Sequence, residues 1–91
     1  GDYFALQVSG DSMLDIGIID GDYVVVRRQP DAESGEVVVA MVGVEATIKR
    51  LVKKRTQIEL HSENPKYRPI ILNGEKELRI LGIYVGLIRL H

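Results

Sequence analysis

The chain has 91 residues, of which 45% are apolar and 27% are charged, and its formal net charge is −1. These values are typical of one folded domain with a single modest core, and they exclude a disordered chain. The near-neutral charge supplies no general electrostatic attraction to nucleic acid or to an anionic membrane, so a DNA-reading face is not expected.

The residue inventory excludes several kinds of chemistry. The chain has no cysteine, which rules out disulfides, thiolate catalysis and cysteine-based zinc sites and is compatible with a reducing cytoplasm. His61 and His91 stand thirty residues apart without paired ligand spacing, so we expect no metal site and no cofactor. No apolar run approaches the ~20 residues of a membrane span, and the start lacks a basic segment followed by an apolar one. We therefore expect a soluble, cytoplasmic protein.

Short segments of β-branched and aromatic residues, separated by turn residues, run through most of the chain. Strands are predicted at residues 4–8, 23–28, 36–42, 44–51, 56–61 and 69–72, and one long strand is predicted between 77 and 90. Residues 13–19 are expected to hold one short helical turn. Because no convincing helical period appears elsewhere, we predict an all-β fold, a small sandwich or partly open barrel of short, mostly antiparallel strands.

Turn residues and charges add local detail to this prediction. Asn73-Gly74 is a strong signal for a hairpin turn. Gly82 and Gly86 interrupt the last strand and predict bulges or bends in it. The basic run at residues 52–55 is expected to be a solvated turn rather than a binding patch.

Ser12 follows the first predicted strand, within Ser9-Gly10-Asp11-Ser12-Met13. A hydroxyl just past a strand end can act as a nucleophile on rigid scaffolding, although serine between strands usually marks only a turn. The Gly-x-Ser-x-Gly elbow is absent because position 14 is Leu, and Ser-x-x-Lys is absent because position 15 is Asp. The acidic residues of this segment are expected to serve turn formation rather than a partner-facing patch: Asp11, Asp15, Asp20 and Asp22.

A serine nucleophile requires a base, because its hydroxyl is almost wholly protonated at neutral pH. His61 is the only internal histidine and is expected to be a partly exposed surface residue. Lys49 is the one lysine predicted in mid-strand, on the face shared with Thr47 and Leu51. Burial can lower a lysine pKa by up to ~3–5 units and make the amine a general base, whereas a snorkelling lysine keeps its head in water. The strand alone leaves both readings open.

Two linked motifs resemble the C-terminal domain of the LexA repressor family. The first is Ser9-Gly10-Asp11-Ser12-Met13 with residues 15–18 and 20–22, which is similar to that family's nucleophile region. The second combines residues 35–40 with Thr47-Ile48-Lys49-Arg50-Leu51, in the family's order and separation. The likeness then continues to the end and covers nearly the whole chain, through Glu63-Asn64, Tyr67, Pro69-Ile70 and residues 82–89.

The resemblance implies a serine–lysine dyad in which Ser12 is the nucleophile and Lys49, as a neutral amine, is the general base. It also implies that backbone N–H groups of Ser12 and Asp11 hold the developing oxyanion. Family members cleave themselves at an Ala-Gly bond when the RecA–single-stranded DNA filament stimulates them after DNA damage. They form homodimers by edge pairing of a C-terminal strand, which corresponds here to about residues 82–90.

The likeness does not extend to every part of such a repressor. Family members carry a DNA-binding helix-turn-helix domain and an Ala-Gly cleavage loop ahead of the nucleophile, and this sequence shows neither pattern. We therefore expect residues 1–91 to be a catalytic and dimerisation fragment. It would contact DNA only through a missing N-terminal domain, and it would at most cleave a peptide supplied in trans.

Related readings stay open beside this one. The polymerase accessory protein UmuD shares the serine motif and the lysine strand, and several phage repressors share the architecture. Bacterial signal peptidases share a Ser-x-Met start, but they usually have proline where Leu14 stands and need a membrane anchor. A non-catalytic β-domain for dimerisation or partner binding belongs to a different class, and it has no need of a neutral Lys49.

Overall fold

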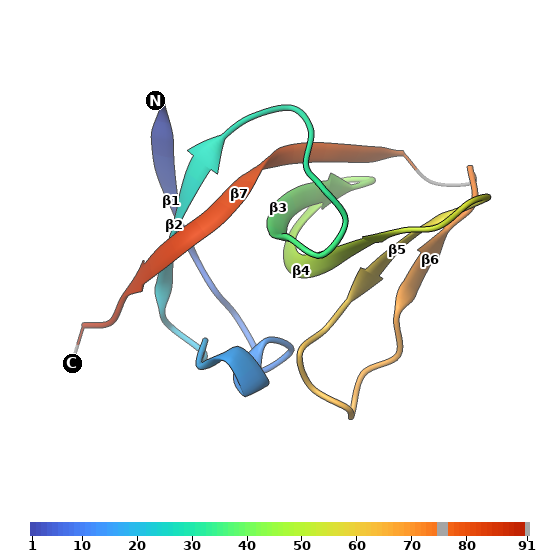
Figure 1. Cartoon of the computed structure of the whole chain (residues 1–91). Coiled ribbons are helices and arrows are strands. Elements are labelled where there is room, and N and C mark those ends of the chain that lie inside the picture. Colours follow the sequence, from blue (N-terminus) through green and yellow to red (C-terminus); the bar gives the residue numbers. More distant parts are fainter. Residues whose placement is uncertain (75–76, 91) are drawn as a thin grey trace.

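The computed structural model describes residues 1–74 and 77–90, which form one β-sheet and a single short 3-10 helix (Figure 1). The elements in chain order are β1 (Tyr3–Gln7), η1 (Leu14–Ile16), β2 (Tyr23–Arg28), β3 (Val37–Val42), β4 (Glu45–Lys53), β5 (Ile58–His61), β6 (Ile70–Leu72) and β7 (Leu78–Ile88). The strand order is β1-β2-β7-β3-β4-β5-β6, and every neighbouring pair is antiparallel. The predicted all-β fold is confirmed, as one open, twisted sheet. None of the described residues belongs to a helix long and apolar enough to cross a membrane.

Strand bounds follow the sequence pattern closely. β2 has the predicted bounds, and the predicted helical turn is present as η1. The main difference is at the end of β4, which continues to Lys53 and leaves residues 54–57 as the connection to β5. The expectation that the whole run 52–55 is a turn is therefore wrong for its first half. Val52 instead pairs with Glu59 in the ladder, where a β-branched side chain is favoured.

Asn73-Gly74 does not join two neighbouring strands, so the predicted hairpin is wrong. β6 pairs with β5, while β7 pairs with β2 and β3, among the residues that the structure describes. Gly74 does adopt the left-handed backbone that turns require, with φ of 98°. Long-range contacts, rather than the local turn, decide which strands β7 pairs with. With 11 residues, β7 is long enough to bond to both β2 and β3 in the middle of the sheet.

β7 joins the two halves of the sheet. Its first half pairs with β3 and its second half with β2, and each ladder skips one residue, Leu81 beside Gly82 and Val85 beside Gly86. The predicted bulges are therefore confirmed. Glycine is required at position 82, because a Cβ there would lie 2.3 Å from the carbonyl oxygen of Arg27. The C-terminal strand for which edge pairing is expected has an unpaired side only in the second half of β7, where no described strand lies on the side away from β2.

Buried apolar side chains form two clusters rather than the single core expected from the chain length. Val39 belongs to the first cluster, with Met13 and Ile48, whereas Val38 and Ala40 belong to the second. Successive residues of a strand point to opposite faces, so three consecutive buried residues mean that β3 is covered on both faces. The first cluster includes residues of the connection from β1 to β2 and so anchors that connection to the sheet.

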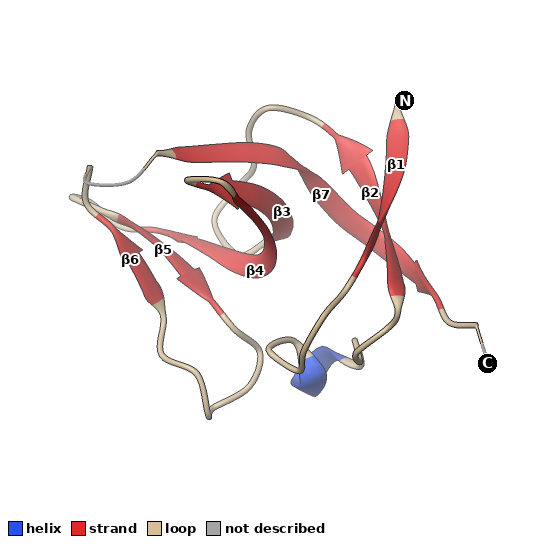
Figure 2. Ribbon diagram, turned by 180° about the vertical axis from the view of Figure 1, so that it is seen from behind, coloured by secondary structure: helices blue, strands red, loops and turns tan. Residues whose placement is uncertain are grey.

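The twist of the sheet brings its two ends together. Figures 1 and 2 both show the η1 segment beside the loop between β5 and β6, although these strands lie at the opposite end of the order from β1 and β2. The N–H of Asp15 donates to the carbonyl oxygen of Glu63 at 2.8 Å across this junction. Two loops that are distant in sequence thus meet on the side of the molecule that carries Ser12.

Candidate active site

The loop of residues 9–12, here called the nucleophile loop, is fixed at both ends. Gly10 has φ of 86°, a left-handed conformation that residues with a side chain rarely adopt, and its N–H donates to Asp20 Oδ1 at 2.7 Å. Met13, directly after the loop, is fully buried in the first cluster. Ser12 is therefore held between anchored residues, as a preorganised nucleophile requires.

A buried carboxylate fixes the chain that returns from this loop to β2. Asp22 accepts hydrogen bonds from the N–H of Ile19, from Arg89 Nε and from Arg89 Nη2, each at 2.8 Å. Such charge-assisted, two-pronged contacts offset the cost of taking a carboxylate out of water. The expectation of turn chemistry is thus confirmed for Asp20 and Asp22.

β4 brings Lys49 to the nucleophile loop. Lys49 Nζ lies 3.0 Å from Ser12 Oγ, 2.9 Å from Thr47 Oγ1 and 3.1 Å from the carbonyl oxygen of Ile48. Thr47 and Lys49 share one face of β4, as strand alternation predicts. Thr47 is a site residue that the sequence patterns indicated only as a neighbour, since a mid-strand threonine is otherwise unremarkable as a β-former.

The surroundings of Lys49 disfavour its charge. Its side chain is half-buried, and its partners are three neutral oxygens, with no carboxylate paired to it in the described residues. Burial lowers the pKa of Lys49 below its ordinary value of 10.5, because the ammonium loses water. A lysine with its amine extended into water does not match this geometry, because Nζ is bonded to protein on three sides.

The backbone N–H groups of Asp11 and Ser12 are the candidates for an oxyanion site. Within residues 1–74 and 77–90, the N–H of Ser12 donates no hydrogen bond, whereas the N–H of Asp11 interacts with the carboxylate of the same residue. The carbonyl of Asp11, by contrast, accepts from the N–H of Leu14 at 3.3 Å and from Asn64 Nδ2 at 2.8 Å. An unpaired N–H next to Ser12 is suited to a developing oxyanion, and the use of both N–H groups for this purpose stays a prediction.

Ser12 and Lys49 line a small cleft of about 170 Å³ between the end of β1 and the first half of β4. Along this cleft, residues 45–49 of β4 pair with β3 alone, because β5 joins the ladder only from Arg50 onward. This edge of β4 has no strand partner among the described residues. An extended peptide laid in the cleft can therefore pair with it.

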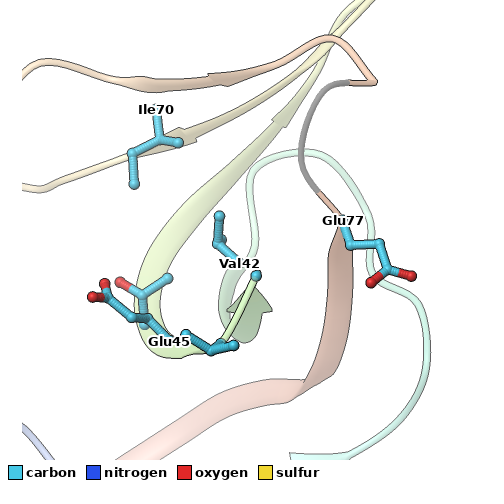
Figure 3. A pocket seen from close by; sticks show the side chains of 7 residues that line it. Val42, Glu45, Ile70 and Glu77 are labelled. Carbon is cyan, nitrogen blue, oxygen red and sulfur yellow. The ribbon is translucent and has the colours of Figure 1, made fainter.

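A larger pocket of about 740 Å³ adjoins the cleft at Thr47, which lines both. Its walls come from the β3–β4 hairpin, from β6 and from the residue before β7. Figure 3 shows Val42 and Ile70 within it, with Glu45 and Glu77 on opposite sides of Val42. The pocket thus combines apolar walls with two carboxylates, next to the site rather than at it.

The described hydrogen bonds of His61 do not include Ser12, the candidate nucleophile. Its Nε2 is 2.8 Å from Glu59 Oε1, and the described hydrogen bond to the Ser12 hydroxyl comes from Lys49. The expectation of a partly exposed histidine is confirmed, since 35% of its side chain is exposed. No group of three His, Cys, Asp or Glu side chains in the described ranges is placed to hold a metal ion.

The sequence patterns missed one part of the site, the loop between β5 and β6. Asn64, Lys66 and Tyr67 all bond to Asp11, the residue before Ser12. The family likeness included Asn64 and Tyr67 without a role for either. A loop rich in turn residues has no periodicity from which such a contact can be predicted.

Comparison with known proteins places these residues in a family. The sequence matches that of the Peptidase S24-like family over residues 1–85. It is 53% identical over 89 residues to the LexA repressor of Syntrophotalea carbinolica, covering 98% of this chain and 44% of that protein. It is 55% identical over 86 residues to the LexA repressor of Oleidesulfovibrio alaskensis, covering 94% of this chain and 42% of that protein. It is 49% identical over 90 residues to the LexA repressor of Geobacter sp., covering 98% of this chain and 45% of that protein. The chain spans less than half the length of these curated relatives.

Proposed function

Since this chain belongs to the Peptidase S24-like family, we propose that it is the self-cleaving serine peptidase domain of a LexA-type repressor. The observation that carries the proposal is the 3.0 Å separation of Ser12 Oγ and Lys49 Nζ in a cleft. Ser12 is then the nucleophile and Lys49 the general base of a serine–lysine dyad.

The first chemical step uses the lowered pKa of Lys49. As a neutral amine, Lys49 accepts the proton of the Ser12 hydroxyl while Oγ attacks the carbonyl carbon of a peptide bond. Thr47 Oγ1 and the Ile48 carbonyl oxygen hold Nζ in place and accept hydrogen bonds from the ammonium that forms. Neutral oxygens stabilise that ammonium less than a carboxylate would, so the proton stays available for the next step.

The later steps use backbone donors and the same amine. The N–H groups of Asp11 and Ser12 would hold the oxyanion, and loss of one such donor elsewhere costs ~3–4 kcal/mol of transition-state stabilisation. Lys49 then gives its proton to the departing amine, which leaves an ester on Ser12. Water hydrolyses this ester, releases the carboxylate product and restores the hydroxyl.

We propose an Ala-Gly bond in the parent repressor as the substrate, cleaved under stimulation by the RecA–single-stranded DNA filament. This sequence has no Ala-Gly pair, so the substrate lies in chain outside these 91 residues. Residues as small as Ala and Gly suit the narrow cleft beside Ser12. An extended segment rises about 3.3 Å per residue, so one paired with residues 45–49 of β4 reaches the larger pocket within a few residues.

Dimerisation through β7 is the second role that we propose. Apart from the bulged Val85, residues 84–88 pair with β2 on one side, and they have no described strand on the other. Exposed apolar side chains follow this edge, with Val85, Ile88 and Leu90 exposed to 47%, 49% and 75%. An unpaired edge of this kind is a template for a second copy of the chain. Contact with DNA would then belong to another domain of the parent repressor.

The test is cleavage in trans of a peptide that contains the Ala-Gly site, from neutral to alkaline pH. Cleavage by this chain should rise with pH, and Ser12→Ala should abolish it without a change in the urea midpoint, because a hydroxyl is lost and no core volume. Ser34→Ala, in the loop before β3, is the matched control and should cleave normally. Full activity of Ser12→Ala would overturn the assignment, and no cleavage by the folded, dimeric chain would favour a non-catalytic dimerisation domain.

A further inference from the structure

We propose that the loop of residues 62–69, here called the tether loop, positions both members of the dyad, and that it holds Ser12 through Asp11. This inference rests on the peptidase function proposed above and adds positioning residues to it. The need for such an element follows from the topology. Ser12 follows β1 and Lys49 lies on β4, and three strands separate β1 from β4 in the sheet order.

Three side chains of the tether loop converge on Asp11. Asn64 Nδ2 donates to the Asp11 carbonyl oxygen at 2.8 Å, Lys66 Nζ donates to Asp11 Oδ2 at 2.8 Å, and the Tyr67 hydroxyl donates to Asp11 Oδ1. The carbonyl of Asp11 and the N–H of Ser12 belong to one planar peptide unit. Holding that carbonyl therefore sets the direction in which the Ser12 N–H points, and this N–H is one of the proposed oxyanion donors.

The same loop is bonded to the strand that carries Lys49. Arg50, the next residue of β4, donates from Nε to Glu63 Oε1 and from Nη1 to the carbonyl oxygen of Gly35, both at 2.5 Å. The carbonyl oxygen of Glu63 accepts the N–H of Asp15, just past Ser12. The tether loop is thus bonded to the residue after Lys49 and to residues on both sides of Ser12.

The tether loop is itself ordered by Asn64. Asn64 Oδ1 accepts the N–H of Lys66, and the Asn64 carbonyl oxygen accepts the N–H of Tyr67, both at 3.1 Å. Asn64 thereby uses its side-chain oxygen inside the loop and its side-chain nitrogen on Asp11. A turn closed in this way presents its donors at fixed positions, which a flexible loop does not.

The charged contacts of the tether loop are exposed, so variants that remove them should change the positioning of Ser12 without changing the stability of the fold. Lys66 and Asp11 have 64% and 39% of their side chains exposed, and ion pairs of this kind contribute little to global stability. The hydrogen bond from Lys66 lowers the pKa of Asp11, and the bond to Asp11 raises the pKa of Lys66. The contact therefore persists in the alkaline range where Lys49 loses its proton.

The experiment compares Asp11→Ala and Asp11→Asn in trans cleavage, with Lys53→Met as control. Asp11→Ala leaves every backbone N–H and the bond from Asn64 to the Asp11 carbonyl in place, so a loss reports on the contacts of Lys66 and Tyr67 with the Asp11 carboxylate. Lys53 forms a similarly exposed ion pair with Asp31, at 3.2 Å, in a different contact. We expect Asp11→Ala to lower kcat roughly 10- to 100-fold, since a 1 Å misplacement has effects of this size. KM, the urea midpoint and the pH at which the rate rises should not change.

Two further readouts distinguish a positioning role from a merely structural one. Asp11→Asn keeps one acceptor oxygen and replaces the other by a donor amide, so it can retain one of the two bonds from Lys66 and Tyr67 and should recover part of the lost kcat. Asp11→Ala combined with Lys66→Met should lose no more than Asp11→Ala alone. Amide hydrogen exchange of residues 10–13 should be about tenfold faster in Asp11→Ala than in Lys53→Met.

Either of two results would overturn the proposal: a kcat of Asp11→Ala within twofold of that of the unsubstituted chain, or unchanged amide exchange in residues 10–13. If the unsubstituted chain cleaves no peptide at all, the proposed peptidase function fails, and the proposed positioning for catalysis fails with it. Amide exchange in that case still shows whether Asp11 is tethered, so the two failures are distinguishable.

Discussion

Lys49 and Lys66 contact neighbouring residues of one loop, yet their surroundings shift their pKa values in opposite directions. Lys49 reaches Ser12 from β4, is half-buried, and bonds to neutral oxygens, so the loss of water lowers its pKa. Lys66 reaches Asp11 from an exposed loop and bonds to a carboxylate, which raises its pKa. Access to water and the charge of the partner, rather than residue type, decide how each amine titrates.

The difference makes the two amines suitable for the two different roles that we propose. A general base must be neutral for part of the time at working pH, and a lowered pKa supplies that fraction. A tether must keep its charge under the same conditions, and a carboxylate partner ensures this. The nucleophile loop thus lies between an amine suited to proton transfer and one suited to holding a backbone in place.

The largest expected effect comes from removing the buried amine. Lys49→Ala should lower the rate of peptide cleavage roughly 100- to 10,000-fold, the range found for loss of a general base. Lys53→Ala, at the exposed end of the same strand, should leave the rate unchanged. Partial recovery with an added amine or at high pH would support the role of Lys49 as base. A Lys49→Ala chain of normal activity would remove the dyad.

The dependence of cleavage rate and stability on pH should distinguish the contribution of Lys49 from that of Lys66. The cleavage rate should rise as pH increases through the folded-state pKa of Lys49, with an inflection below 10.5. Because the fold disfavours the Lys49 ammonium, stability should also rise as pH passes from this lowered pKa toward 10.5. Lys66 contributes in the opposite sense, since its stabilisation is present below 10.5 and is lost as pH rises through its raised pKa.

The changes of rate and of stability with pH are measured as cleavage rates and urea midpoints over the alkaline range. Lys66→Met should lower the plateau of the rate without moving its inflection, because Lys66 acts on Asp11 and not on Nζ of Lys49. An inflection at or above 10.5 in the parent chain would contradict the assignment of Lys49 as a base poised by burial.

The smallest expected effects are on stability. Lys49→Met should leave the urea midpoint unchanged or slightly raised, because a half-buried ammonium without a carboxylate partner costs free energy that a thioether does not. Lys66→Met should be indistinguishable from the parent chain in the same measurement, because the pair it breaks is exposed. Marked destabilisation by Lys49→Met would instead indicate a structural lysine.

Local chemistry in the sequence determined much of this protein. β-branched runs set the strands, the bounds of β2 among them, and glycines at 82 and 86 mark the bulges of β7. Strand alternation places Lys49 beside Thr47, and the serine motif and lysine strand indicate the pair that the fold brings within 3.0 Å. These features depend on neighbours within a few residues, which a sequence pattern records directly.

Only the tertiary structure decided which distant segments meet. It pairs β7 with β2 and β3 rather than with β6, covers β3 on both faces with separate clusters, and brings the tether loop to Asp11. Such contacts depend on how the twisted sheet brings its ends together, and the patterns of the separate segments do not record that. The sequence of a loop of turn residues looks the same whether the loop faces water or orients the peptide unit next to Ser12.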